Sequence, residues 1–281
     1  MVDGQVEIRY MHFSLTMHAE RRLARWVAWN IDGPSRWDGD DIPREGLRFL
    51  PDPRVPAAAQ ITDPVYARNR LDRGHLARRA DLLWGPRPEA EVANRHSFFF
   101  TNITPQMDNF NQSGQNGIWG RLENAVLATT GTQRVSVLAG PVLAAGDPVY
   151  RGVQVPLMFW KVLVYRPDGQ DLRARAFVVT QSLKGLRVAS PLDEFATYEV
   201  TLTDLAQRSG LNFDDTLIAA ATTADPGQVG PLDADPPTGD GIGSHSLVSQ
   251  PGCGTARSKV TSQFLGNGTQ SMRGVAMKNH A

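Results

Sequence analysis

Cysteine, net charge and long apolar runs are what this sequence has least of. Cys253 is the only cysteine in 281 residues, which excludes an intramolecular disulfide scaffold and a cysteine-rich zinc site. The 29 Lys and Arg residues balance 29 Asp and Glu residues, which argues against a uniformly basic nucleic-acid binder but allows local basic patches. No run approaches the roughly 20 apolar residues of a membrane span, so no membrane partner is expected.

The amino terminus also lacks the basic and then apolar pattern of a secretory signal peptide. We therefore expect a cytoplasmic location, and the single cysteine fits a reducing compartment. Delivery by a specialised system is the alternative that this pattern leaves open.

Two regions of different composition divide the chain. Residues 1–225 contain apolar segments at short intervals and are expected to form one domain. Residues 226–281 contain 10 Gly and 5 Pro, with Phe264 as their only aromatic residue. Such a composition buries little apolar area, so we expect a flexible tail or linker, with a short peptide-like element around residues 259–265.

Residue patterns within the first region indicate a mixed α+β fold. The clearest helix is Ile118–Thr129, where Trp119, Leu122 and Val126 recur at helical spacing. Strands are expected where β-branched and aromatic residues cluster between turn residues. They are Gln5–Leu15, Ser97–Ile103, Arg134–Ala139, Met158–Tyr165 and Ala174–Gln181, whereas Arg22–Ile31 suits a helix or a strand. Grouped strands favour α+β over a strict alternation of strands and helices.

The segment Tyr66–Asn124 holds the residues with the most informative chemistry. In an extended Leu71–Leu76, Arg73 and His75 would project from one face, with Gly74 leaving the opposite face free of bulk. Imidazole titrates near neutral pH and suits a general base, while guanidinium keeps its charge and grips phosphate oxygens in pairs. The pair therefore suits attack of water on a phosphodiester, although a structural histidine and a surface ion pair are the simpler alternatives.

Three further side chains extend this set. The amide of Asn102 could bond the imidazole, or Asn102 could form a turn before a proline. Asn111 offers a neutral oxygen of the kind that Mg²⁺, Mn²⁺ or Ca²⁺ accepts, or it could cap a helix. Glu123 lies on the expected helix, where its carboxylate could hold a metal-bound water or face solvent. No Cys and His cluster has the spacing of a zinc site.

Four ordered motifs then give the sequence a resemblance to a known family. They are Asp72-Arg-Gly-His75, Asn102-Ile-Thr-Pro-Gln106, Phe110-Asn-Gln112 and Trp119 to Leu122-Glu123. In order and spacing they resemble the DNA/RNA non-specific endonucleases of the ββα-metal superfamily, which include endonuclease G. Outlying segments such as Phe159-Trp-Lys161 extend the resemblance over roughly residues 8–222. It implies the ββα-metal fold, with a central antiparallel sheet flanked by helices.

The resemblance also implies a role for each motif residue. His75 would be the general base that activates water, Arg73 would stabilise the phosphorane-like transition state, and Asn102 would orient the imidazole. Asn111 would be the one direct protein ligand of a largely hydrated Mg²⁺, with Mn²⁺ as an alternative, and Glu123 would bind water in its outer shell. Cleavage in this family leaves a 5′-phosphate and a 3′-hydroxyl.

One departure from the family pattern concerns the metal ligand. The stretch between Asn111 and Trp119 is longer than in compact members, so Asn111 and Glu123 need not share one helix. Asn116 then becomes a rival ligand, because its spacing of seven residues from Glu123 is about two helical turns. We retain Asn111 because it has the Phe-Asn-Gln context of the family.

Substrate contacts are expected mainly from basic residues. Residues 66–95 contain seven Arg against four Asp and Glu, a net charge of 7 − 4 = +3, which indicates a local phosphate-binding patch that includes Arg78. Arg54 is a further candidate, although a surface arginine bracketed by prolines is the simpler reading. No module for reading base edges is present, so weak sequence preference is expected.

The expected function is a Mg²⁺-dependent endonuclease acting on DNA, with RNA as a second substrate. Two alternatives remain: a nucleic-acid-binding protein that has lost turnover, and a phosphodiesterase for a small substrate. A promiscuous nuclease would endanger its own cell, which suggests control by an inhibitor, an activating partner or the tail, and a homodimer is also left open.

Overall fold

The computed structural model describes residues 6–112, 114, 117–129, 133–167, 170–186, 197–221, 258–261 and 276–279. Within them, no helix has both the length and the apolar character that crossing a membrane requires.

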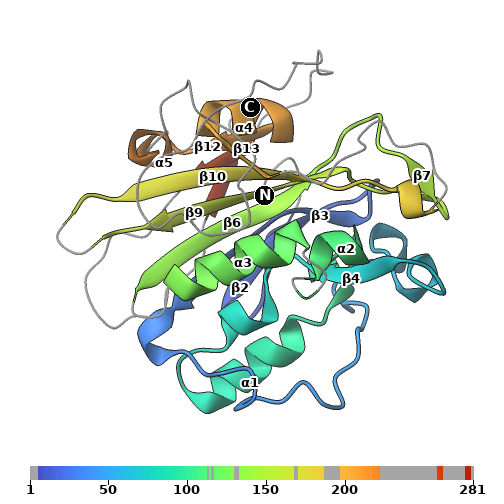
Figure 1. Ribbon diagram of the computed structural model, residues 1–281, viewed down its shortest axis with the longest axis horizontal. Coiled ribbons are helices and arrows are strands. Elements are labelled where there is room, and N and C mark those ends of the chain that lie inside the picture. The colour runs from blue at the N-terminus through green and yellow to red at the C-terminus, as the bar shows by residue number, and fades with distance from the viewer. Residues whose placement is uncertain are drawn as a thin grey trace.

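A seven-stranded sheet forms the centre of the molecule, with every neighbouring pair of strands antiparallel (Figure 1). Its strand order is β1-β2-β3-β6-β9-β10-β11. The bounds are β1 (Ile8–Arg9), β2 (Phe13–His18), β3 (Leu23–Asp32), β6 (Arg134–Val142), β9 (Met158–Tyr165), β10 (Arg173–Thr180) and β11 (Thr197–Val200).

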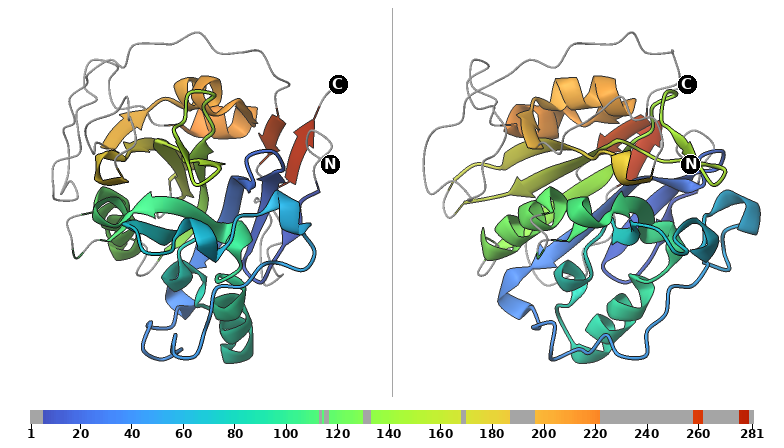
Figure 2. Two further views of the ribbon diagram at one scale, coloured as in Figure 1. Left: turned by 90° about the vertical axis from the view of Figure 1, so that its right-hand side faces the viewer. Right: turned by 45° about the vertical axis from the view of Figure 1, so that its right-hand side comes forward.

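The long connection from β3 to β6 carries the functional motifs and lies on one face of this sheet (Figures 1 and 2). It contains the two-stranded ribbon β4 (Leu71–His75) and β5 (Ile103–Met107) and the helices α1 (Arg87–His96), α2 (Asp108–Asn111) and α3 (Ile118–Thr129). The other face is covered by α4 (Leu202–Ser209) and α5 (Asp215–Ala220).

Short elements complete the described chain. Two strands, β7 (Val149–Tyr150) and β8 (Val153–Gln154), form a separate hairpin. Single-turn 3₁₀ helices occur at Gly33–Ser35, Ala57–Ala59, Asp63–Val65, Arg79–Leu82, Phe100–Asn102 and Lys184–Leu186. Of these, Arg79–Leu82, labelled η4, lies between β4 and α1.

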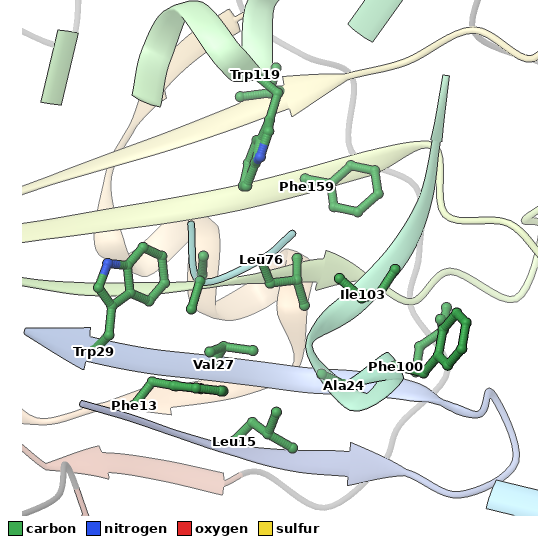
Figure 3. Close-up of a cluster of buried hydrophobic side chains, with 14 of the residues drawn as sticks. Phe13, Leu15, Ala24, Val27, Trp29, Leu76, Phe100, Ile103, Trp119 and Phe159 are labelled. Atoms are coloured by element: carbon green, nitrogen blue, oxygen red, sulfur yellow. The ribbon is translucent and has the colours of Figure 1, made fainter. Parts of the chain in front are cut away.

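Helices on both faces explain why the central strands are apolar almost throughout. In β9, Phe159 packs on the face that carries α3, whereas Trp160 and Val162 pack on the face that carries α4. Figure 3 shows the first of these cores, in which Trp29 and Val27 of β3 face Leu76, Ile103 and other apolar side chains of the long connection. Burial of these side chains fixes the β4–β5 ribbon and α3 against the sheet.

Most of the expected elements are confirmed. The α+β class with a central antiparallel sheet is as expected, and β9 and α3 have the predicted bounds. The ambiguous segment Arg22–Ile31 forms strand β3, and β9 and β10 pair as a hairpin. Residues 168 and 169 of its expected turn lie outside the described residues.

Two predicted strands differ from the structure, the first in part and the second almost entirely. Gln5–Leu15 is divided into β1 and β2 by a tight turn in which His12 has a φ of 68°. Ser97–Ile103 is largely the turn between α1 and β5, which begins only at Ile103. Phe98 and Phe100 in that turn are buried, so packing against the core accounts for the aromatic run that suggested a strand.

Two tetrapeptides of the carboxy-terminal region form strands. β13 (Ser258–Thr261) pairs parallel to β12 (Leu211–Phe213), and β14 (Ala276–Asn279) pairs antiparallel to β13. The Lys259–Leu265 element that the sequence suggested thus overlaps β13. The rest of residues 226–281 lies outside the described residues, and the flexible tail stays a prediction.

Candidate active site

Strand β4 places Arg73 and His75 on the same side of the ribbon, as their spacing predicted. Gly74 between them is a packing requirement, because a Cβ at this position would lie 2.0 Å from Oε1 of Gln106. The neighbouring β5 thus fills the opposite face and leaves Arg73 and His75 to the other side.

His75 lies in an aromatic pocket. The ring of Phe98 meets the imidazole edge-on at 5.3 Å between centroids, and Phe49 lies 5.7 Å away. His75 Nε2 is enclosed and has no hydrogen-bond partner among the described residues, so we take Nδ1 as the ring nitrogen left for chemistry. Burial lowers the pKa of the imidazole to about 3, and nearby positive charges add to this effect; they belong to Arg44, Arg79 and Arg78. His75 is therefore neutral at physiological pH, as a proton acceptor must be.

Arg73 is positioned by the same aromatic wall. Its guanidinium lies over the rings of Phe49 and Tyr66, at 5.5 and 5.3 Å from the ring centroids, and its Nε donates to Asp63 Oδ1 at 2.8 Å. Phe49 thus touches both Arg73 and His75. Because Asp63 is well exposed, a phosphate could replace it as the partner of Arg73.

Asn102 lies behind His75 but does not bond the imidazole, which corrects the expected direct orientation of the ring. Its Oδ1 accepts from the Ala77 amide at 2.9 Å, and its Nδ2 donates to the carbonyls of Ala77 and Ser97. Its own carbonyl accepts from the Leu76 amide. Asn102 therefore fixes the backbone that follows His75, and any effect on the imidazole passes through that backbone.

Asn111 ends helix α2 and bonds the first residue of the Asp72-Arg-Gly-His75 motif. Its Nδ2 donates to Asp72 Oδ2 at 3.0 Å, and Gln112 donates to the same oxygen at 2.7 Å. Asp72 thereby fixes the amide and leaves Asn111 Oδ1 without a hydrogen bond in the described part of the chain. A hard cation would find a free, oriented oxygen there, so the site fits a divalent metal with one protein ligand.

Two observations limit the metal site. No group of three or more His, Cys, Asp or Glu side chains that could hold a metal is found among the described residues. Asn111 and Glu123 lie on separate helices, as the longer connection suggested. The helices meet closely at Gly117, where a Cβ would lie 2.6 Å from the Phe110 carbonyl oxygen. The rival ligand Asn116 lies outside the described residues.

Glu123 is largely buried, contrary to a solvent-facing helical charge. Lys161 Nζ lies 3.3 Å from its Oε1, and Arg78 Nε lies 3.7 Å from its Oε2. Arg78 also donates to Asn124 at 2.8 Å. The positive charge of Arg78 also helps to lower the pKa of His75, so Arg78 is near enough to both groups to be a candidate contact for a substrate phosphate.

Arg54, the further candidate for a phosphate contact, is already paired within the protein. Its guanidinium makes two hydrogen bonds to the buried carboxylate of Asp52, bonds the Arg9 carbonyl and lies over the Tyr10 ring. Through these contacts Arg54 links Arg9 and Tyr10, near the amino terminus, to the loop that contains Asp52.

Three residues near the site were missed. Arg44 lies exposed over the Phe98 ring at 5.3 Å and is the largest positive contribution to the pKa shift of His75. Asp72 fixes Asn111, and Lys161 contacts Glu123. The sequence offered two signals, because Asp72 begins a motif of the family and Lys161 is a lysine inside the apolar strand Met158–Tyr165, whereas Arg44 carries none.

Comparisons with known proteins agree with this arrangement. A family model described as DNA/RNA non-specific endonuclease matches residues 2–220. The uncharacterized protein y4fB of Sinorhizobium fredii is 33% identical over 237 residues, covering 78% of this chain and 35% of that protein. Human mitochondrial endonuclease G is 30% identical over 213 residues, covering 71% of this chain and 66% of that protein.

A solved structure shares the fold. The crystal structure of the EndoG/EndoGI complex, which addresses the mechanism of EndoG inhibition, matches with a TM-score of 0.59 at 20% identity. The match covers 73% of this chain and 83% of that chain. The expected ββα-metal fold is thereby confirmed. Because the family model matches residues 2–220, which are most of this chain, the chain belongs to the DNA/RNA non-specific endonuclease family.

Proposed function

We propose that this chain is a Mg²⁺-dependent endonuclease that hydrolyses phosphodiester bonds of DNA, with RNA as a second substrate. The observation that carries the proposal is a neutral, half-buried imidazole beside a fixed guanidinium on one side of β4. Products with a 5′-phosphate and a 3′-hydroxyl belong to the same proposal. Bound Mg²⁺, or Mn²⁺ in its place, would supply Lewis-acid stabilisation of the departing 3′-oxygen.

His75 would begin the reaction by taking a proton from the attacking water. Its Nδ1 would accept this proton, while the ring packs against Phe98 and Phe49. Asn102 holds the backbone of Leu76 and Ala77 directly after His75. The general base is thus fixed before substrate arrives, which lowers the cost of aligning it with the water.

Arg73 would bind the scissile phosphate and stabilise the charge that develops on its oxygens. Its planar fork fits two phosphate oxygens, and the rings of Phe49 and Tyr66 limit its motion. Arg78 is a further phosphate contact in this proposal, whereas Arg54 is left out because Asp52 occupies it. Contacts of this kind position a nucleic acid without reading its bases, so cleavage would show little sequence preference.

Purified protein incubated with supercoiled plasmid and with RNA, in Mg²⁺ or in EDTA, tests the function. We expect metal-dependent cleavage of plasmid at many sites, and labelling of the product ends should show 5′-phosphates. Nucleic-acid binding without cleavage would favour an inactive nuclease fold. Cleavage confined to a small diester would favour a specialised phosphodiesterase.

Asn111→Ala should raise the Mg²⁺ concentration needed for half-maximal cleavage by at least about tenfold. Loss of an outer-shell partner typically lowers metal affinity by about 10–100-fold, and loss of a direct ligand should lower it at least as much. Asp72→Asn should give a smaller shift, because Asp72 orients the amide through one hydrogen bond. A Mg²⁺ titration of plasmid nicking measures both. Asn116→Ala is the comparison variant. Wild-type behaviour of Asn111→Ala together with a shift in Asn116→Ala would transfer the ligand role to Asn116.

The pH dependence of cleavage should reflect the lowered pKa of His75. The imidazole accepts a proton only when neutral, and its pKa lies well below the ordinary 6.5, so kcat/KM should hold its plateau as pH falls through 6.5 and decline only at more acidic pH. Rates measured from about pH 4 to pH 8 at saturating Mg²⁺ test this. A half-maximal rate close to pH 6.5 would contradict the proposed environment of His75.

Control of the activity is a further part of the proposal. We propose a cytoplasmic location, where an inhibitor, an activating partner or the tail would restrain cleavage, and a homodimer is a further proposal. If the purified chain cleaves plasmid on its own, no activating partner is required. If truncation after Asp225 leaves its specific activity unchanged, the tail does not restrain cleavage. Sedimentation of the purified protein would test the dimer.

A further inference from the structure

Lys161 is an unusual residue at its position. It lies in the middle of β9 with only 1% of its surface exposed, and the pairs Ala139–Lys161 and Phe177–Lys161 place it deep in the central sheet. An ammonium group in such a place loses its hydration and needs compensating partners. A leucine or methionine would fill the same volume without that cost, so packing alone does not explain a lysine here.

The partners of the ammonium come from the elements that carry the candidate site. Glu123 Oε1 of α3 lies 3.3 Å from Lys161 Nζ. Two indole rings flank the charge, with the Trp119 centroid at 4.2 Å and the Trp29 centroid at 5.5 Å, and both contacts are favourable for a cation. Lys161 therefore joins the sheet to helix α3 at the level of Glu123.

A second buried carboxylate belongs to the same cluster. Asp81 of η4 accepts from the Trp29 indole at 3.1 Å, while its other oxygen is enclosed and has no hydrogen-bond partner in the part of the chain that the structure describes. Burial raises the pKa of Asp81 to about 6; the charge of Glu123 raises it further, whereas those of Lys161 and Arg78 lower it. The cluster thus contains two cations and two carboxyl groups, and Glu123 is the carboxyl that contacts both cations.

We propose that Lys161 is a positioning residue for the nuclease reaction, holding the Glu123 carboxylate in place between the central sheet and the active site. This inference rests on the proposed function and on the role that the family resemblance implies for Glu123, which is to bind water in the outer shell of the metal. Lys161 of the central sheet contacts one carboxylate oxygen, and Arg78, three residues after His75 in the chain, approaches the other. Two side chains thus hold the carboxylate. An active-site group needs such support from neighbouring residues to keep its orientation.

A double-mutant cycle separates positioning from simple stabilisation. The four proteins are wild type, Lys161→Met, Glu123→Gln and the double variant, compared for kcat, KM and unfolding midpoint at saturating Mg²⁺. Lys161→Met should lower kcat by about 10–100-fold with little change in KM, a typical loss when a supporting partner is removed. The double variant should be no less active than Glu123→Gln, because Lys161 acts through Glu123.

Arg175→Met is the control for loss of a partly buried cation that is paired with a buried carboxylate. Arg175 of β10 makes two hydrogen bonds of 2.8 Å to the buried Glu199 of β11. Neither residue has been assigned a role in the candidate site. The control should lower the unfolding midpoint while kcat per folded molecule stays at the wild-type value. A similar kcat loss in Lys161→Met and Arg175→Met would show a general effect of destabilisation and overturn the inference.

The double variant keeps the test decisive if Lys161→Met alone fails to fold, because it leaves neither an ammonium nor a carboxylate of this pair in the core. Equal kcat in the double variant and Glu123→Gln supports positioning. A further loss of tenfold or more in the double variant overturns it, as does wild-type kcat in folded Lys161→Met. Metal-dependent cleavage by wild type is measured first. If wild type does not cleave, the proposed function fails, and this result is distinct from a failure of the inference about Lys161.

Discussion

His75→Ala is expected to lower the rate of Mg²⁺-dependent DNA cleavage by about 10²–10⁴-fold, the contribution typical of a general base. The expectation rests on the lowered pKa of the imidazole, which keeps it neutral, and on the rings of Phe98 and Phe49 that pack against it. Initial rates of plasmid nicking, normalised to folded protein, measure the effect.

A histidine outside the site provides the control for loss of packing. His96 ends α1, accepts a hydrogen bond from the Met11 amide through Nδ1 and packs against Tyr10 and Phe99. His96→Ala should lower the unfolding midpoint and leave the rate per folded molecule unchanged. Equal rate losses in His75→Ala and His96→Ala would remove the special role of His75.

Arg73→Ala is expected to lower kcat by about 10²–10³-fold, as removal of a preorganised group that stabilises transition-state charge does in other enzymes. Arg73→Lys should recover part of this loss, because lysine restores the charge without the planar fork that grips two oxygens. Single-turnover cleavage of a short DNA duplex at saturating protein isolates the chemical step from binding.

Arg70→Ala is the matched control for loss of a nearby positive charge. Arg70 lies three residues before Arg73, is about half exposed and bonds Asp108 through both Nε and Nη2. We expect only a modest rise in KM that diminishes at higher salt. If the single-turnover rate of Arg73→Ala were as high as that of Arg70→Ala, Arg73 would only attract substrate by its charge and would not act on the scissile phosphate.

The sequence predicted those parts of the fold that depend on local pattern. Helix α3 was predicted from apolar residues at helical spacing and β9 from a dense β-branched and aromatic run, and both have the predicted bounds. The extended conformation of Asp72-Arg-Gly-His75 placed Arg73 and His75 on one side correctly, because side-chain alternation is a local property.

Pairings between distant segments could not be predicted in this way. Nothing near Asn102 in the sequence shows that its amide would bond Ala77, and nothing near Arg54 shows that Tyr10 would pack against its guanidinium. The aromatic run before Ile103 suggested a strand because the sequence does not show which core would bury it. The cluster of Lys161, Glu123 and Asp81 likewise joins segments 38 to 80 residues apart (161 − 123 and 161 − 81).

The most direct test of the central claim is plasmid nicking by wild type and His75→Ala, each in Mg²⁺ and in EDTA, at equal concentrations of folded protein. The proposed function predicts rapid nicking only by wild type in Mg²⁺, with at least about a hundredfold lower rate in the His75 variant and none for either protein in EDTA. Equal nicking by both proteins in Mg²⁺, or nicking that survives EDTA, would contradict a metal-dependent nuclease with His75 as its base.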